Sequence, residues 1–410
     1  MHTPVVITGL DQVSPLGIST SDLDVAIQTG LSGISRYDLN LPGIDPASVA
    51  IGRVGLDTSK QLAPSKVPMD RGTALALVVA QRAAAQAQLL KSDVDPQRLG
   101  VYWGSGMAGA HTFDSSCEAL YAQHRRLRPT NVVTTMPNAP AAEIALLLHA
   151  RGASLSFACA CASSAVAIGE ALYAIRSGRL DVVLVGGSES MLTPGVIASW
   201  QAMRVLAPAG DDPATACKPF DLHRKGFALG EGAAAFVLES REHALRRGAL
   251  PLAVLSGYGT SSDGVHITNP DASGQVRAMQ SALNDAGLQP AHIGYINAHG
   301  TATLAGDLAE SHSVTEVFGN HSVPISSTKA LHGHLLGAGG AVELAIAVRS
   351  LTTHRLPIAA NLDQVDPQIQ LNLVTPANSH APELMHVMSN AFAFGGTNAV
   401  LIASHSEHKR

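Results

Sequence analysis

The stretch LSFACACASSAVAIGEALYAIRS, residues 155–177, changes from a strand pattern to a helix pattern within a few positions. Residues 155–160 are apolar and predict a buried strand. From Ser163 onward the apolar residues recur at helical spacing, and Gly178 follows as a stop signal. Cys161 therefore falls at the junction, close to the N-terminus of a helix. Because unpaired N–H groups and the helix dipole favour a thiolate there, we expect a lowered pKa for the Cys161 thiol.

Outward from this junction, short β-branched runs alternate with helical patterns, which is typical of an α/β fold. The other predicted strands cover residues 5–10, 101–105, 182–186, 234–238, 253–258, 294–297, 323–327, 387–391 and 400–403. The clearest predicted helices cover residues 71–90, 163–177, 275–286 and 339–350. The polar segment 239–251 is the expected boundary between two domains, residues 1–250 and 251–410. We expect the less regular region 36–68 to pack outside the core.

Bulk composition sets limits on function. The chain has 410 residues, 46% of them hydrophobic, and a formal net charge of −5, which gives no support for nucleic-acid binding. Its four cysteines are too few and too irregularly spaced for a disulfide framework. The chain opens directly on a strand pattern rather than a signal peptide, and no apolar run approaches the ~18 residues of a membrane helix. We expect a soluble protein in the cytoplasm.

Two histidines stand in similar settings. His299 lies in NAHGTAT, residues 297–303, and His334 lies in STKALHGHLLGAGGAVE, residues 327–343. Each follows a predicted strand at a turn rich in Gly and Thr, where a side chain can project into a site. One thiol with two imidazoles indicates a nucleophile and a pair of hydrogen-bond donors for carbon–carbon bond formation.

Two other kinds of site are not supported by the sequence. His332 and His334 are two residues apart and no HExxH motif accompanies them, so we expect no metal. The pattern GSGMAG, residues 104–109, is a weak dinucleotide signal, because no acidic residue follows at the required distance.

Five ordered motifs resemble those of β-ketoacyl-[acyl-carrier-protein] synthases of the elongating, decarboxylating Cys-His-His type. CASSA with the following IG, residues 161–169, resembles the segment around the family's nucleophile. The other four motifs are VVITGLDQVSPLG (5–17), KPFDLHRKGFALGEGAAAFVLE (218–239), STKALHGHLLGAGGAVE (327–343) and SNAFAFGGTNAVL (389–401). The resemblance implies a thiolase-like five-layer αβαβα fold built from two similar halves, usually dimeric. It also implies substrates carried on the phosphopantetheine of an acyl carrier protein, with no permanently bound cofactor.

The resemblance assigns catalytic roles by position. Cys161 would carry the acyl group, and His299 and His334 would stabilise the enolate formed when a malonyl thioester loses carbon dioxide. Lys329 and Glu343 match a lysine and a glutamate that set polarity near the histidines, and the lysine charge would favour neutral imidazoles. An ordinary structural ion pair is the alternative for these two residues.

Further positions match the family's substrate-binding residues. Thr301 and Thr303 resemble the pair that holds the phosphopantetheine arm. Phe394 matches a gate at the acyl pocket, and Phe392 lies on the same loop. Residues expected at the acyl pocket are Met107 and Trp200, for which a role in core packing is the alternative.

Three positions depart from the family pattern, one of them Leu304, where proline is commoner. Relatives usually carry glycine where this chain has Ala393, between the two phenylalanines, and glycine is also commoner at Ala302. A β-carbon restricts backbone conformations with positive φ, so gate opening could be harder here.

The carrier protein is acidic in the resembled systems, so docking would need a local basic patch on this acidic chain. The candidate docking residues are Arg204, Arg125, Arg126, Arg128 and Lys66, each of which could equally be solvated surface.

Three readings of function follow. The first is a 3-oxoacyl-[acyl-carrier-protein] synthase of fatty acid biosynthesis, acting as a homodimer. The second is a ketosynthase of a type II polyketide or polyene pathway, working with a related chain-length-factor subunit. The third, an inactive partner subunit, is disfavoured because Cys161 is intact. A degradative thiolase is also disfavoured, because the segment around Phe394 lacks a second catalytic cysteine.

Overall fold

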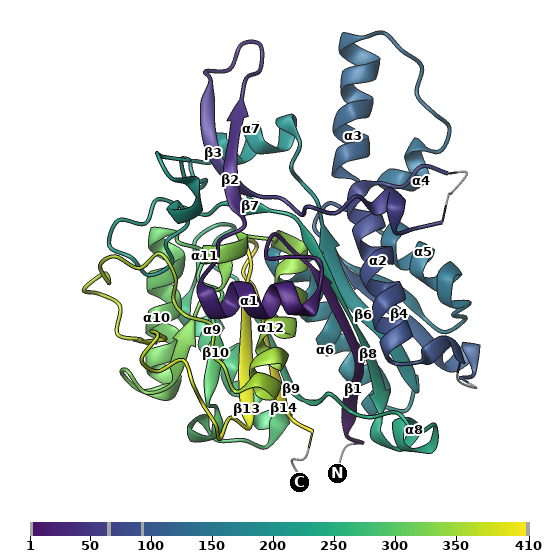
Figure 1. The fold of residues 1–410 in the computed structure, drawn as a ribbon, viewed down its shortest axis with the longest axis vertical. Helices are drawn as coiled ribbons and strands as arrows, with labels where there is room; N and C mark the ends of the chain where they lie inside the picture. Colours follow the sequence, from purple (N-terminus) through teal and green to yellow (C-terminus); the bar gives the residue numbers. More distant parts are fainter. Residues whose placement is uncertain (1–2, 64–66, 92–93, 407–410) are drawn as a thin grey trace.

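The computed structural model describes residues 3–63, 67–91 and 94–406. One large mixed sheet, of order β12-β11-β10-β13-β14-β9-β1-β8-β6-β4-β5, runs through the molecule (Figure 1). Its strands are β1 Val5–Val13, β4 Leu99–Gly104, β5 Ser154–Phe157, β6 Val182–Glu189, β8 Gly232–Ser240, β9 Ala253–Ser262, β10 Tyr295–Asn297, β11 Pro324–Ser326, β12 Asn372–Leu373, β13 His386–Phe392 and β14 Thr397–His405. The first and second halves of the chain join where β1 pairs with β9, over only three residue pairs.

Two helices lie between the two halves of this sheet, and other helices cover the outer face of each half. The helices are α1 Thr20–Thr29, α2 Arg71–Gln86, α3 Ala110–Cys117, α4 Asn131–Thr135, α5 Ala139–Leu148, α6 Ser163–Arg176, α7 Pro194–Ala202, α8 Arg241–Arg246, α9 Ala272–Ala286, α10 Leu304–Phe318, α11 Lys329–His332 and α12 Gly339–Thr353. Helices α6 and α12 contact strands of both halves of the sheet, while α2 and α5 pack outside the first half and α9 packs outside the second, with α10 against α9. The expected five-layer αβαβα arrangement is confirmed.

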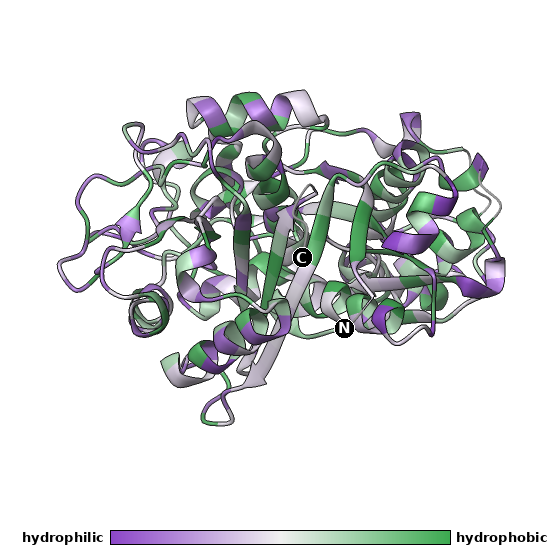
Figure 2. Cartoon of the chain, turned by 90° about the horizontal axis from the view of Figure 1, so that it is seen from below, coloured by the Kyte–Doolittle hydropathy of each residue, from purple (hydrophilic) through white to green (hydrophobic). Residues whose placement is uncertain are grey.

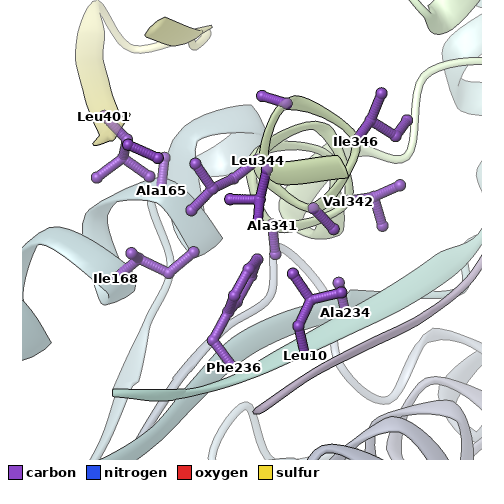
Figure 3. Close-up of a cluster of buried hydrophobic side chains, with 14 of the residues drawn as sticks. Leu10, Ala165, Ile168, Ala234, Phe236, Ala341, Val342, Leu344, Ile346 and Leu401 are labelled. Atoms are coloured by element: carbon purple, nitrogen blue, oxygen red, sulfur yellow. The ribbon is translucent and has the colours of Figure 1, made fainter. Parts of the chain in front are cut away.

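Small residues let the middle layer pack closely. Ala165 and Ile168 of α6 face Ala341 and Leu344 of α12 in one buried cluster, into which Phe236 points from β8 (Figure 3). Alanine at the crossing points lets the two helix backbones approach each other. The high hydrophobic content of the chain is concentrated in this core and in the sheet, whereas polar positions gather on the outer helices and loops (Figure 2).

Two sequence predictions need correction. The strand predicted over residues 155–160 ends at Phe157, and Cys159 lies beyond it rather than on it, because the chain turns into a short 3-10 helix at Ala160–Ala162. The region 36–68 contains regular structure: β2 Ile34–Leu39 and β3 Ala47–Gly52 form a hairpin that pairs with β7 Leu229–Gly230. This small sheet is separate from the main one (Figure 1). Its Leu39, Val49, Ala50 and Ile51 are nevertheless buried in the same hydrophobic cluster as Cys161, so the expectation that the region packs outside the core is wrong.

Within the described residues, no helix has the length and apolar character required to cross a membrane.

Candidate active site

Cys161 lies in the 3-10 turn that joins β5 to α6, where Ala160 takes a positive φ of 46°. The side chain is almost wholly buried, and its Sγ lies 3.1 Å from Nε2 of His334. Burial raises the pKa of the Cys161 thiol to about 12, although the Lys329 charge and the Phe394 N–H oppose the rise. The expected lowering of this pKa is therefore wrong. The effect of burial on the thiol is larger than that of the helix N-terminus, because helix α6 begins only at Ser163.

His299 follows β10 on a turn that a buried carboxylate holds in place. The N–H groups of His299 and Gly300 donate to Glu310 at 2.8 and 2.7 Å. The His299 ring meets the His334 ring edge-on, with centroids 5.4 Å apart. Two chain segments far apart in sequence thus place both imidazoles beside the Cys161 sulfur.

The groups behind the rings fix the tautomer of each histidine. Nδ1 of His334 accepts the N–H of Leu336 at 3.3 Å, and Nδ1 of His299 lies 3.5 Å from Nζ of Lys329. A neutral imidazole that accepts at Nδ1 carries its proton on Nε2. Burial, followed by the Lys329 charge, lowers the pKa of both histidines well below the ordinary value. Both rings are therefore neutral Nε2–H donors.

Lys329 and Glu343 form a fully buried ion pair behind His299. This ion pair fits both the polarity-setting role and the structural alternative, so the role of the two residues stays a prediction. The pair fixes the ammonium beside Nδ1 of His299, and it keeps a cation close to both imidazoles.

The same three side chains satisfy the spacing of a metal site, since their ligand atoms lie within 4.8 Å of one another. Histidine ligands of metals, however, usually donate Nδ1–H to an acceptor and leave Nε2 bare. Here the groups facing the Nδ1 atoms are the Leu336 N–H and the Lys329 ammonium, which are donors. The arrangement suits hydrogen-bond donation better than metal binding.

A cavity of about 280 Å³ opens onto the three side chains. Its lining includes Trp200, Phe227, Phe392, Phe394, Thr301 and Thr303. Trp200 stacks on Phe394 with ring centroids 6.2 Å apart, and both side chains line the cavity together with Cys161. The hydroxyl groups of Thr301 and Thr303 lie 2.9 Å apart on the cavity wall. The cavity lining thus combines aromatic side chains with the two imidazoles and the two threonine hydroxyls.

The remaining predicted residues that the structure describes do not line the cavity. Met107 does not line it: the side chain is 46% exposed and the backbone N–H donates to Glu189. Among the docking candidates, Lys66 lies outside the described residues, and Arg204, Arg125, Arg126 and Arg128 are exposed. Arg204 follows Met203, which lines the cavity, whereas the other three arginines lie in the segment between α3 and α4.

Sequence reasoning missed one aromatic residue of the site. Phe227 meets the His334 ring edge-on at 5.1 Å and the Trp200 ring at 5.6 Å. The residue lies within the quoted motif 218–239, but a phenylalanine in an apolar strand pattern gives no signal of its own.

Comparison with known proteins identifies the class. The family model for the N-terminal domain of beta-ketoacyl synthases matches residues 2–244, and that for the C-terminal domain matches residues 252–363. Nodulation protein E of Rhizobium leguminosarum bv. trifolii is 39% identical over 98% of this chain and 99% of its own length. The 3-oxoacyl-[acyl-carrier-protein] synthase 2 of Staphylococcus aureus (strain N315) is 36% identical over 97% of both chains. The structure of the ishigamide ketosynthase/chain length factor superposes with a TM-score of 0.90 at 28% identity, covering 99% of this chain and 100% of that one.

The fold and the triad define an acyl-transferring enzyme that forms carbon–carbon bonds, with a thiolase-like architecture. The chain belongs to the beta-ketoacyl synthase family.

Proposed function

We propose that this enzyme is a 3-oxoacyl-[acyl-carrier-protein] synthase, which joins an acyl group on Cys161 to malonyl-carrier in fatty acid biosynthesis. The observation that carries the proposal is the pair of Nε2–H donors, His299 and His334, facing the cavity that contains the Cys161 sulfur. Two fixed donors in a water-poor site stabilise a developing enolate oxygen much better than water does. The relatives support the carrier-bound substrate.

Acyl transfer is the first half of the reaction. The Cys161 sulfur attacks the carbonyl carbon of the acyl-carrier, a new C–S bond forms, and the old one breaks. The thiol proton leaves with the carrier's sulfur, so no net charge develops in the buried site. The Phe394 N–H, which points at the sulfur, is the donor available to the oxyanion.

Condensation is the second half. Malonyl-carrier loses carbon dioxide, and the electron pair of the broken bond moves into an enolate whose oxygen accepts Nε2–H from His299 and His334. The enolate carbon attacks the acyl thioester, the C–S bond to Cys161 breaks, and 3-oxoacyl-carrier is released. One proton from solvent returns the sulfur to the thiol form that burial favours.

The cavity walls assign supporting roles within this proposal. Thr301 and Thr303 bind the phosphopantetheine arm. Phe394 is the gate, resting against Trp200, and Phe392 supports it. Ala393 makes opening of the gate costlier than glycine would. Met107 contributes to acyl selection from outside this cavity, at the subunit interface.

Carrier docking and location complete the proposal. Arg204, next to the cavity, docks the acidic carrier, together with Arg125, Arg126, Arg128 and Lys66 of the same or the partner subunit.

All four cysteines are free, which supports a reducing, cytoplasmic compartment.

A second candidate is a type II polyketide or polyene ketosynthase paired with a chain-length-factor subunit. The likeness to the ishigamide ketosynthase/chain length factor favours it. Strand β5, which ends the sheet and leaves Leu155 40% exposed, offers an edge to a second copy of this chain and to a related subunit alike.

Intact-protein mass spectrometry after mixing with acyl-carriers of graded length tests both candidates. We expect a thioester adduct on the wild type and none on Cys161→Ala, with Cys159→Ala as the matched control that still forms it. Preference for saturated acyl groups supports the fatty acid role, and preference for polyketide or polyene groups supports the second candidate. No adduct from any carrier, with folded protein, would contradict the proposal of a synthase that acts without another subunit.

A further inference from the structure

Glu189 is a buried carboxylate that the proposed reaction does not use. It is the last residue of β6, has no measurable solvent exposure, and forms no ion pair within the part of the chain that the structure describes. Burial raises the pKa of this carboxyl to about 7, while hydrogen bonds oppose the rise. Its donors are the N–H groups of Gly106 (2.6 Å), Met107 (3.1 Å) and Gly337 (3.2 Å) and the hydroxyl of Ser105 (3.2 Å).

The Gly337 contact reaches the turn that orients His334. Leu336 has a φ of 48°, in the left-handed region that a leucine rarely adopts, so the surrounding structure must hold it there. The N–H of Leu336 donates to Nδ1 of His334, and the next N–H along the chain, that of Gly337, donates to Glu189. Two successive peptide groups thus connect the His334 ring to the end of a central strand.

We propose that Glu189 is a positioning residue that anchors the Leu336 turn and thereby keeps His334 in its Nε2–H form. On the other side the same carboxylate binds the loop 105–107, so it ties two loops to the rigid strand β6. Without the anchor the strained turn can relax, and the Leu336 N–H then moves away from Nδ1. His334 would lose the bond that selects its tautomer.

Glu189→Gln tests the proposal with little change in side-chain volume. Each carboxylate oxygen accepts two donors, so a glutamine must turn its NH2 group toward two of them. Two measurements are made on 15N-histidine-labelled enzyme: side-chain 15N shifts of His334, assigned with His334→Asn, and condensation kinetics. We expect a mixture of His334 tautomers and a fall in kcat of at least about tenfold, with KM for malonyl-carrier nearly unchanged.

Two further variants control the test. Ser105→Ala removes a donor from the same carboxylate but leaves the Gly337 contact intact, and we expect wild-type tautomer and kcat. Glu189→Asp keeps the charge but shortens the side chain by one methylene group, so we expect the same defect as in Glu189→Gln. This variant keeps the test usable if the glutamine variant fails to fold.

An unchanged His334 spectrum in folded Glu189→Gln or Glu189→Asp would overturn the proposal, whatever the effect on rate. The kinetic readout rests on the proposed function, but the tautomer readout does not. A wrong reaction assignment would therefore leave the tautomer result intact, and the two failures can be told apart.

Discussion

At the scale of single residues, burial decides the charge state of the site. His299, His332 and His334 all have pKa values lowered from the ordinary 6.5, with burial as the largest cause in each case. Hydrogen-bonding partners then decide which nitrogen carries the proton. Burial and hydrogen bonding together therefore make His299 and His334 neutral donors of fixed orientation.

The stability of the protein should fall as pH decreases below 6.5 because of these histidines. The unfolded chain binds a proton at each position there while the folded protein does not, so the unfolding free energy decreases. His334→Asn removes one such site. Relative to this variant, the wild type should lose about 1 kcal/mol over the first pH unit below 6.5.

Urea denaturation at a series of pH values measures this difference. The exposed His149, which already has a left-handed φ of 52° that asparagine tolerates, gives the matched control His149→Asn. Equal pH dependence in wild type and His334→Asn would contradict a neutral buried His334.

Sequence reasoning at this scale found the three central side chains but not their energetics. Cys161, His299 and His334 are recognisable because each stands in a motif of its own, rich in small residues or in glycine and threonine. The predicted shift of the Cys161 thiol pKa had the wrong direction. The shift depends on how deeply Cys161 is buried, and residues distant in sequence determine that burial. Glu189 lies outside the recognised motifs, and Phe227 is an ordinary apolar position within one of them, so only the structure reveals their contacts.

At the scale of elements, the turn between β10 and α10 carries strain at Ala302. This alanine has a φ of 63° and is fully buried. Its N–H donates to Asp307 at 3.0 Å and its carbonyl accepts from Gly226 at 2.9 Å, so the conformation is held from both sides. Ala302, which replaces the glycine commoner in the family, therefore stands at a backbone conformation that glycine adopts more easily.

Ala302→Gly should raise the unfolding free energy by up to about 1 kcal/mol, because relief of left-handed strain exceeds the entropy that glycine loses. Ala298→Gly is the matched control on the same segment: Ala298 is buried without a positive φ, and its replacement should be destabilising. Chemical denaturation compares the two variants. Equal destabilisation would show that Ala302 carries no strain.

Element prediction succeeded where the periodicity was long and failed at short segments. The helices α6 and α12 begin where the sequence indicates and end within three residues of the predicted positions. The hairpin of β2 and β3 was missed because β2 is half exposed and because β3, which is mostly buried, pairs with β7, far along the chain. The domain division at residue 250 stays a prediction.

At the scale of the whole molecule, exposed apolar side chains lie on the edge strand β5, on helix α5 that packs against it, and on the segment from α3 to α4. Among them are Phe113, Tyr121, Val132, Val133, Met136, Leu146 and Leu155, which lie on α3, the segment after it, α4, α5 and β5. An unpaired sheet edge next to such a surface is typical of a subunit interface. We expect the enzyme to be a dimer through β5.

Leu155→Arg should convert this dimer to monomers, because the charge would be buried without a partner at the interface. Leu250→Arg, at an 83% exposed leucine between α8 and β9, is the matched control and should stay dimeric. Light scattering measures both masses. A dimeric Leu155→Arg would place the interface elsewhere.

The position of β1 in the sheet also has a consequence for synthesis of the chain. Val5 pairs with Ser240 on one side and with Leu255 on the other. The first strand to leave the ribosome therefore has no strand partner until more than half of the polypeptide has been translated, although helix α2, which packs on it, is translated earlier. During that interval its apolar residues need shielding, so a nascent-chain chaperone that binds this segment would set how much of the enzyme reaches the native state.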